Sequence, residues 1–373
     1  MSAVDSSHAR RRCVVVKLGS STVTTASGAI DSDVIGRVSA EVASLALSGE
    51  HVVVVTSGAI ACGWSALGRT GQRPSDPSLL QALSAVGQQR LMSAWQDAFK
   101  THGLLAGQVL LAPLDFGHRR QYLYARTTLG HLWNLGVVPV VNENDAVADE
   151  EIRFGDNDRL AALVAHLVSA DVLVLLTDTP GLLSEDPRLG GSGSLIEEVL
   201  DVDQRLLDVA GGPGSVGSGG MVSKLAAARM ASRSGVTTVI ADGRRPGVVK
   251  DALAGVPGVG TVCRPHAERM PARKLWIAYA LGAAGRLVVD DGARRALVER
   301  GRSLLAAGVV GCSGSFERDD AVEIAGAEGN VFAKGLVRTS SERAAEWVGR
   351  RSEELPEDLS PVVVHRDDLV VLA

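Results

Sequence analysis

The first two-thirds of the chain alternates short apolar runs with longer stretches in which apolar residues recur at helical spacing. The short runs predict buried strands at 13–17, 51–55, 104–111, 137–141, 171–176, 236–241 and 259–262, the last as an edge strand. The longer stretches predict helices at 31–47, 77–100, 119–135, 160–168 and from 225 onward. Because nearly all of these strands read as apolar on both faces, the pattern predicts a mainly parallel open sheet sandwiched by helices.

The pattern changes after residue 263. The segment RPHAERMPAR at 264–273 is prolyl and charged, as interdomain linkers often are. Beyond it the apolar runs are shorter, at 287–289, 321–324, 331–337 and 362–364, with one clear helix at 292–300. This texture predicts a small β-barrel-like domain. We therefore divide the chain into a first domain (1–263), a linker (264–274) and a second domain (275–373).

Length and composition fit this division. A chain of 373 residues, 46% hydrophobic, is long enough for about two domains with their own cores. No apolar run approaches the roughly 20 residues of a membrane span, and the N-terminal MSAVDSSHARRR lacks the apolar segment of a signal peptide. We expect no membrane contact and a cytoplasmic location. The four cysteines have no CxxC spacing, which indicates neither a zinc site nor a disulfide framework.

Polar residues follow four of the predicted strands at the point where each strand ends. Lys17 follows Val16, a TSG turn follows Val55, the NEND cluster follows Val141, and a TD pair follows Leu176. In an open parallel sheet these carboxyl ends meet at one edge, where ligands bind. A second acidic cluster, GDND at 155–158, opens the next helix. Taken alone, each cluster is more typical of an acidic loop with a helix cap, and the recurrence of polar residues at other strand ends favours a ligand site.

Lysine positions carry information because the chain has only six lysines against 32 arginines. Lys17 and Lys224 both lie in glycine-bearing segments beside apolar elements, where a compact ammonium suits phosphate neutralisation. Lys224 follows GGPGSVGSGG at 211–220, which holds six glycines and runs into a helix. Such a loop presents free backbone amides to an anion, although a flexible linker has the same composition. Neither a GxGxxG motif nor a Walker A loop can be written across it.

Six motifs in this order and spacing carry a family resemblance: VVVKLGSS, VVVVTSGAI, VVPVVNENDAV, FGDND, LLTDTPGL and GSGGMVSKLAAA. They resemble the glutamate-phosphorylating members of the amino acid kinase family, from Arg12 onward. The C-terminal domain resembles a PUA domain. Ser20 and Ser218 stand where the family often has Thr, and either hydroxyl can make the same hydrogen bonds.

The resemblance implies ATP-dependent phosphorylation of the γ-carboxylate of L-glutamate to L-glutamate 5-phosphate, the first step of L-proline biosynthesis, with Mg²⁺. It implies that Lys17, Asp158 and Lys224 are catalytic, with Asp158 organising the lysines. L-Glutamate would bind Ser57, Asp145 and Asn157, with help from Asp156. ATP would bind Lys17, Thr177, Asp178, Ser218, Gly219, Gly220, Met221, Val222, Ser223 and Lys224. It further implies feedback inhibition by L-proline and a homo-oligomer, either a dimer or a tetramer.

Two other functions fit parts of the sequence. Another member of the same family, acting on aspartate, N-acetylglutamate or a nucleoside monophosphate, would share the fold, but the NENDAV and GDND pair and the PUA-like tail argue against it. An RNA-binding protein would use the tail, where Arg294, Arg295, Arg300 and Arg302 gather. Acidic residues at 290, 291 and 299 lie among them, and the net charge of −5 argues against broad nucleic-acid binding. We interpret that face as an ordinary solvated surface.

Overall fold

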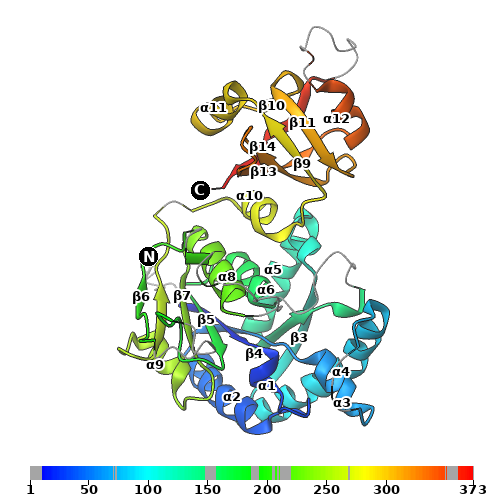
Figure 1. The fold of residues 1–373 in the computed structure, drawn as a ribbon. Coiled ribbons are helices and arrows are strands. Elements are labelled where there is room, and N and C mark those ends of the chain that lie inside the picture. Colours follow the sequence, from blue (N-terminus) through cyan, green and yellow to red (C-terminus); the bar gives the residue numbers. More distant parts are fainter. Residues whose placement is uncertain are drawn as a thin grey trace, which may run out of the picture. The chain divides into compact units, whose positions relative to one another are not determined.

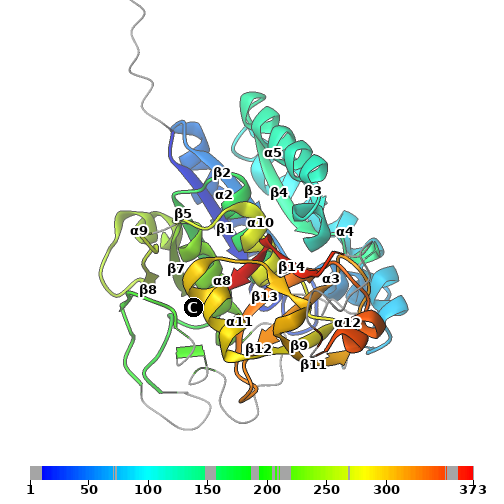
Figure 2. The same cartoon turned by 90° about the horizontal axis from the view of Figure 1, so that it is seen from above.

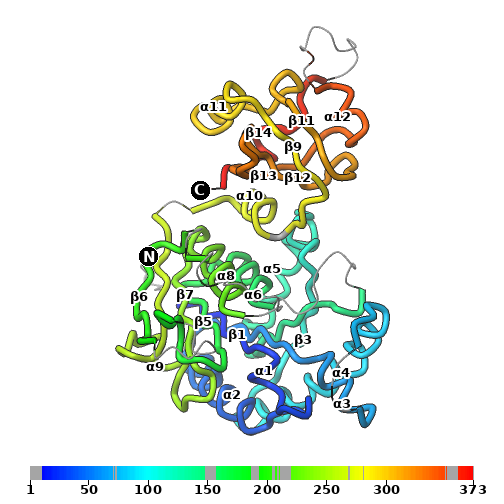
Figure 3. The backbone as a smooth tube through the Cα atoms, viewed as in Figure 1, coloured from blue at the N-terminus to red at the C-terminus, as the bar shows by residue number. Residues whose placement is uncertain are grey.

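The computed structural model describes residues 11–69, 71, 74–147, 157–185, 193–203, 206–207, 210, 220–267, 269–348, 350 and 360–372. The chain forms two compact units (Figures 1 and 3). The first comprises Met1–Ala112 and Arg120–Arg269, and the second comprises Pro113–Arg119 and Met270–Ala373. The predicted domain boundaries at 263 and 275 stay predictions.

The first unit is built on a sheet that has eight strands in the described part of the chain, in the order β3-β4-β2-β1-β5-β7-β8-β6 (Figure 2). The strands are β1 Cys13–Leu18, β2 His51–Val55, β3 Leu105–Leu111, β4 Val137–Glu143, β5 Val172–Thr177, β6 Glu198–Val199, β7 Thr237–Asp242 and β8 Gly260–Cys263. Every neighbouring pair is parallel except β7 and β8. The predicted mainly parallel sheet is therefore confirmed.

One detail of the strand prediction was wrong. β8 is not an edge strand, because the two-residue strand β6 pairs along its outer side. Among the described strands, β3 pairs only with β4, and its Leu105 is 60% exposed.

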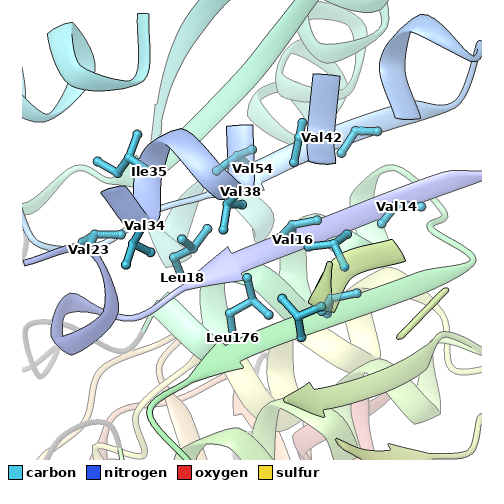
Figure 4. Packing of buried hydrophobic residues seen from close by; sticks show 14 of the residues in the cluster. Val14, Val16, Leu18, Val23, Val34, Ile35, Val38, Val42, Val54 and Leu176 are labelled. Carbon is cyan, nitrogen blue, oxygen red and sulfur yellow. The ribbon is translucent and has the colours of Figure 1, made fainter. Parts of the chain in front are cut away.

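The core of this unit follows from the two-residue period of β1. Val14, Val16 and Leu18 point to one face of the sheet, where they belong to an apolar cluster that includes residues of α2 (Ser32–Leu47), α4 (Pro77–Lys100) and α9 (Val248–Ala254). Figure 4 shows them with Val34, Val38 and Val42 of α2. Each such fully buried valine or leucine contributes about 1.5–3 kcal/mol relative to exposure. The alternate residues, ending with Lys17, point to the opposite face, which α6 (Asn157–Leu167) and α8 (Met221–Arg233) cover. The same alternation thus buries the valines and delivers Lys17 to the helix layer.

The remaining elements of the first unit are short or peripheral. They are α1 Ser20–Val23, α3 Ala59–Ala66, α5 Arg119–Asn134 and the 3-10 turn η2 Asp145–Val147. The predicted helices at 31–47, 77–100 and 119–135 match α2, α4 and α5 closely. α6 begins at Asn157, three residues before the predicted start at 160. Asp158 in the first turn favours this earlier start, because a carboxylate there is stabilised by the helix dipole.

α3 and α4 lie side by side and touch backbone to backbone (Figure 3). Gly63 and Gly87 stand at the crossing: a Cβ added at Gly87 would lie 1.8 Å from the carbonyl oxygen of Ala59, and one at Gly63 would lie 1.9 Å from that of Leu83. Only glycine fits at such a distance. The close crossing brings the α4 side chains on either side of Gly87, Ser84 and Gln88, next to the start of α3.

The second unit contains a six-stranded sheet in the described residues, ordered β10-β14-β13-β12-β9-β11. Its strands are β9 Gly285–Val289, β10 Leu304–Leu305, β11 Val309–Gly314, β12 Ala321–Ala325, β13 Val331–Val337 and β14 Val362–Val371. Its helices and turns are η1 Pro113–Phe116, α10 Ala272–Leu275, η4 Trp276–Ala280, α11 Asp291–Arg300, η5 Ala306–Gly308 and α12 Ser341–Trp347. The sheet curls around its own apolar core, which includes Leu287, Phe316 and Ile324. The predicted small β-barrel-like domain is confirmed.

Among the described residues, no helix is both long and apolar enough to span a lipid bilayer.

Candidate active site

The carboxyl ends of β1, β2, β4 and β5 open into one cavity of about 740 Å³. The cavity is lined by six of the predicted site residues, which come from distant parts of the chain: Lys17, Ser57, Asp145, Asn157, Thr177 and Lys224. The expectation that the polar strand ends share one edge of the sheet is therefore confirmed. A groove of similar size between α2 and α4, lined in part by Arg90 and Asp97, contains none of these residues.

Asp158 holds two lysines at the floor of this region. Its Oδ1 lies 2.5 Å from Lys17 Nζ, and its Oδ2 lies 3.2 Å from Lys224 Nζ. The Ser223 hydroxyl lies 2.8 Å from the same Oδ2. All three ionised side chains are at most 7% exposed. One carboxylate thus faces two ammonium groups, and the three side chains together carry one net positive charge that suits an anionic ligand.

The pKa of Asp158 reflects this pairing. Burial alone would raise it, but the charges of Lys17 and Lys224, with hydrogen bonds from Lys17 and Ser223, hold it below the ordinary value for an aspartate. Asp158 is therefore ionised at neutral pH. Its two oxygens contact the two lysine ammonium groups.

The loop after β1 lies beside the Lys17 ammonium. Gly19, Ser20 and Ser21 line the cavity, and a Cβ added at Gly19 would lie 3.6 Å from Lys17 Nζ. Gly58, at the start of α3, has φ +102, and a Cβ there would lie 2.9 Å from a Val23 methyl carbon. Glycine is required at position 58 because L side chains rarely adopt that backbone conformation. The turn lets the backbone next to Ser57 approach the cavity closely.

Asp145 is a buried carboxylate in the first residue of η2. It is 7% exposed, and Ser84 Oγ donates a hydrogen bond to its Oδ2 over 3.0 Å. No basic side chain forms a salt bridge with it among the residues that the structure describes. Burial raises the pKa of Asp145 to about 6, and the hydrogen bond from Ser84 opposes that rise. Asp145 therefore presents a buried carboxylate that could bind a cationic group of a ligand.

Asn157 is held by its side-chain nitrogen. Nδ2 lies 2.6 Å from the Thr56 carbonyl oxygen, 2.8 Å from Asn142 Oδ1 and 2.9 Å from Ser57 Oγ. Asn157 therefore links the ends of β2 and β4 at the cavity wall. Ser57 and Asn157, which come from separate motifs and are both predicted to bind the substrate, lie in direct contact.

The predicted nucleotide residues are only partly described. Thr177 is buried and lies at the end of β5, where its hydroxyl is 3.1 Å from Asp178 Oδ1. Gly220 precedes α8, and Met221, Val222 and Ser223 form its first turn together with Lys224. Asp156, Ser218 and Gly219 lie outside the described residues. Within the described part of the chain, no three His, Cys, Asp or Glu side chains are grouped to hold a metal ion.

The sequence reasoning missed Ser84 and Gln88, and it placed Asn142 in the NEND cluster without giving it a role of its own. Ser84 and Gln88 are buried on the face of α4 that the helical period assigned to the core, and Asn142 Nδ2 donates to Gln88 Oε1 over 2.6 Å. Val86, predicted on that face, is 42% exposed. A signal was present: positions 84 and 88 are polar yet stand in helical register with Leu80, Leu83 and Leu91. Polar residues within an apolar stripe indicate hydrogen-bonding partners at that face of the helix.

The fold and the site together define an α/β protein with a cavity suited to an anion at one side and a cation at another. A model of the amino acid kinase family matches residues 12–242, and a model of the PUA domain matches residues 285–359. The chain belongs to the amino acid kinase family and carries a C-terminal PUA domain.

Curated relatives match almost the whole chain. The glutamate 5-kinase of Chromobacterium violaceum is 47% identical over 98% of this chain and 99% of its own length. The glutamate 5-kinases of Pelobacter propionicus and Syntrophotalea carbinolica are each 45% identical over 96% of this chain, and the matches span 97% and 96% of those relatives.

Proposed function

We propose that this chain catalyses the ATP-dependent phosphorylation of the γ-carboxylate of L-glutamate to L-glutamate 5-phosphate, the first step of L-proline biosynthesis. One observation carries the proposal: a single cavity contains both the lysine pair on Asp158 and the carboxylate of Asp145, which forms no salt bridge within the described part of the chain. The lysine pair suits a phosphate group, and the Asp145 carboxylate suits the ammonium group of an amino acid. The names of the relatives support the same reaction.

The proposed reaction does not require a general base. A glutamate side chain with a pKa of about 4.3 is already ionised at neutral pH, so no general base has to activate it. A γ-carboxylate oxygen forms the new bond to the γ-phosphorus of ATP, and the bond from that phosphorus to the ADP oxygen breaks. Lys17 and Lys224 neutralise the phosphoryl group in transit, and Asp158 keeps both ammonium groups in place.

L-Glutamate is proposed to bind through Ser57, Asp145 and Asn157, with its α-ammonium against Asp145. ATP is proposed to bind at the ends of β5 and α8, through Thr177, Asp178 and the segment from Ser218 to Lys224, with Lys17 also on its phosphates. Asp156 is proposed to assist substrate binding. Mg²⁺ is proposed to enter with ATP, because this ion commonly binds through substrate phosphates together with one or two carboxylates.

Several expectations about partners and location stay predictions. They are the homo-oligomer, inhibition by L-proline, an RNA contact through the PUA domain and the cytoplasmic location.

A coupled assay tests the function directly. The purified chain is given MgATP and, separately, L-glutamate, L-aspartate, N-acetyl-L-glutamate and UMP, and ADP release is followed. With each acceptor at a physiological concentration, we expect ADP release with L-glutamate and not with the other three acceptors. Preferential turnover of any other acceptor would reject the proposed substrate and leave the family assignment intact.

Replacing Asp145 with Asn is expected to raise KM for L-glutamate by roughly 10- to 100-fold, with KM for ATP nearly unchanged. Losing a charge-assisted hydrogen bond costs about 1.5–3 kcal/mol, and each 1.4 kcal/mol is a factor of ten. Steady-state kinetics with each substrate varied in turn measures both constants. Asp97→Asn, on the exposed side of α4, is the matched control and should change neither constant. Equal changes in both constants for Asp145→Asn would contradict the assignment.

The pH profile gives a second test of Asp145. Binding of the α-ammonium needs the ionised carboxylate, whose pKa is about 6, so kcat/KM for L-glutamate should fall as pH decreases through that value. Ser84→Ala removes a hydrogen bond that lowers this pKa, so its acid limb should move to higher pH. In Asp145→Asn that limb should be absent. An acid limb at the same pH in all three proteins would show that another group titrates.

A further inference from the structure

Two neighbouring strands, β5 and β7, end together next to the proposed ATP residues. Their last residues, Thr177 and Asp242, are register partners, and the Gly243 backbone N–H donates to the Thr177 carbonyl oxygen over 2.8 Å. A Cβ added at Gly243 would lie 3.1 Å from the Leu176 Cβ. The turn that follows β7 is therefore packed directly against the end of β5.

Arg244 reaches from this turn to the first residue after β5. Its backbone N–H and its Nε both donate to Asp242 Oδ1, over 2.9 Å and 3.0 Å, and its Nη2 donates to Asp242 Oδ2 over 3.3 Å. The same Nη2 also donates to the Asp178 carbonyl oxygen. Because both oxygens of the Asp242 carboxylate bind one edge of the guanidinium group, they fix its plane and its direction.

The main chain at Asp178 is held by this contact. Asp178 is exposed and lies in a bend outside any helix or strand, whereas Thr177 before it is buried within the sheet. Within the described part of the chain, the Asp178 carbonyl oxygen accepts a hydrogen bond from Arg244 and from no other donor. The direction of the peptide group that follows Asp178 therefore depends on Arg244.

The next residue, Arg245, has a different partner. Its guanidinium group lies 3.0 Å from Asp251 Oδ2 in α9, and no hydrogen bond joins it to Asp178 in the described structure. The side chains of Arg244 and Arg245 are 61% and 41% exposed. One turn thus carries two exposed, ion-paired arginines, of which Arg244 alone contacts a proposed ATP residue.

We propose that Arg244 is a positioning residue for ATP: held by Asp242, it fixes Asp178 at the end of β5 in the orientation in which Asp178 contacts the nucleotide. This inference rests on the proposed function, because Asp178 is itself a proposed ATP residue. Arg244 touches neither the acceptor nor the phosphoryl group in transit. Its contribution is therefore confined to ATP affinity, and kcat and KM for L-glutamate do not depend on it.

The first test measures Kd for MgATP by isothermal titration calorimetry without any acceptor, and kcat and both KM values in the coupled assay. Arg244→Gln should raise Kd and KM for ATP by about three- to fivefold, the upper range for an exposed ion pair, and leave kcat and KM for L-glutamate within about twofold. Arg245→Gln is the matched control, because it removes the same charge from the same turn, and it should change none of the four constants.

The control separates positioning from charge and from stability. An equal loss of ATP affinity in Arg244→Gln and Arg245→Gln would show that only the net charge of the turn matters, and would overturn the proposal. A rise in KM for L-glutamate as large as that for ATP would overturn it as well. Thermal unfolding of both variants checks the fold, and we expect no significant change in Tm because both ion pairs are exposed.

A double-mutant cycle tests whether Arg244 acts through Asp178. Asp178→Ala should weaken MgATP binding, and adding Arg244→Gln should then cause little further loss, because the positioned side chain is gone. Additive losses would show that Arg244 acts on the nucleotide independently, against the proposal. An unchanged Kd in Asp178→Ala would remove Asp178 from the ATP site, and this inference with it.

The titration also separates this inference from the proposed reaction, since it needs no acceptor. A wild-type chain that binds MgATP but does not phosphorylate L-glutamate would reject the proposed acceptor, and the Kd values of the variants would still decide the role of Arg244. A wild-type chain that does not bind MgATP would reject both.

Discussion

Replacing Lys17 with Ala is expected to lower kcat by about 10²–10³-fold, the range found when one preorganised electrostatic contact to a transition state is removed. Lys17 is buried at the end of β1, and its ammonium is fixed 2.5 Å from Asp158 Oδ1. A charge held rigidly in a poorly solvated site stabilises the phosphoryl group in transit without reorganising. The effect should therefore appear in kcat more than in KM for L-glutamate.

The fold should survive this substitution because Asp158 keeps Lys224 and Ser223 as partners. Lys224→Ala is expected to lower kcat by a similar factor and to keep the fold, since Asp158 then keeps Lys17 as a partner. Lys250→Ala, on an exposed position of α9, is the matched control and should leave kcat unchanged. The assay compares kcat of the four proteins at saturating MgATP and L-glutamate, with thermal unfolding as the fold check. Near-normal kcat in Lys17→Ala or in Lys224→Ala would remove that lysine from the mechanism.

Much of the fold and the charged part of the site could be predicted from the sequence. Runs such as 13–17 and 51–55 are apolar at every position, which is typical of strands buried on both faces of a parallel sheet. Because parallel strands end at a common edge, residues that follow separate runs could be placed together without any knowledge of the topology. This reasoning places Lys17, the TSG turn and the NEND cluster at one edge, and the family resemblance singles out Ser57 and Asp145 within them; all three residues line one cavity.

The supporting residues could not be found by the same reasoning. Ser84 is 61 positions from Asp145, and Gln88 is 54 positions from Asn142, so no local pattern joins them. Helical periodicity assigned that face of α4 to the core, which is correct for burial and silent about hydrogen bonds. Short elements such as α1 and β10 were also missed, because two to four residues carry no period.

Gly87 was also not recognised as a contact residue from the sequence, where it appears only as an interruption of a predicted helix. In the structure, Gly87 lies where α4 contacts the backbone of α3. Replacing Gly87 with Ala is expected to reduce the free energy of unfolding by about 3 kcal/mol. The added Cβ would lie 1.8 Å from the Ala59 carbonyl oxygen and 2.4 Å from the Gly63 nitrogen. Both are backbone atoms, so the strain cannot be relieved by a side-chain rotation and the helices must separate.

The separation should also reach the site, because Ser84 and Gln88 flank Gly87 on the same face of α4 and hold Asp145 and Asn142. Gly87→Ala should therefore combine a fall of roughly 5–10 °C in Tm with a higher KM for L-glutamate. Gly130→Ala in α5 is the matched control: a Cβ there meets nothing within 4 Å, so alanine should be neutral or stabilise by about 0.5–1 kcal/mol. Calorimetry and steady-state kinetics on the two variants separate the outcomes. An unchanged Tm in Gly87→Ala would mean that α3 and α4 do not cross as closely as the structure places them, and an unchanged KM with a lowered Tm would separate the helix crossing from substrate binding.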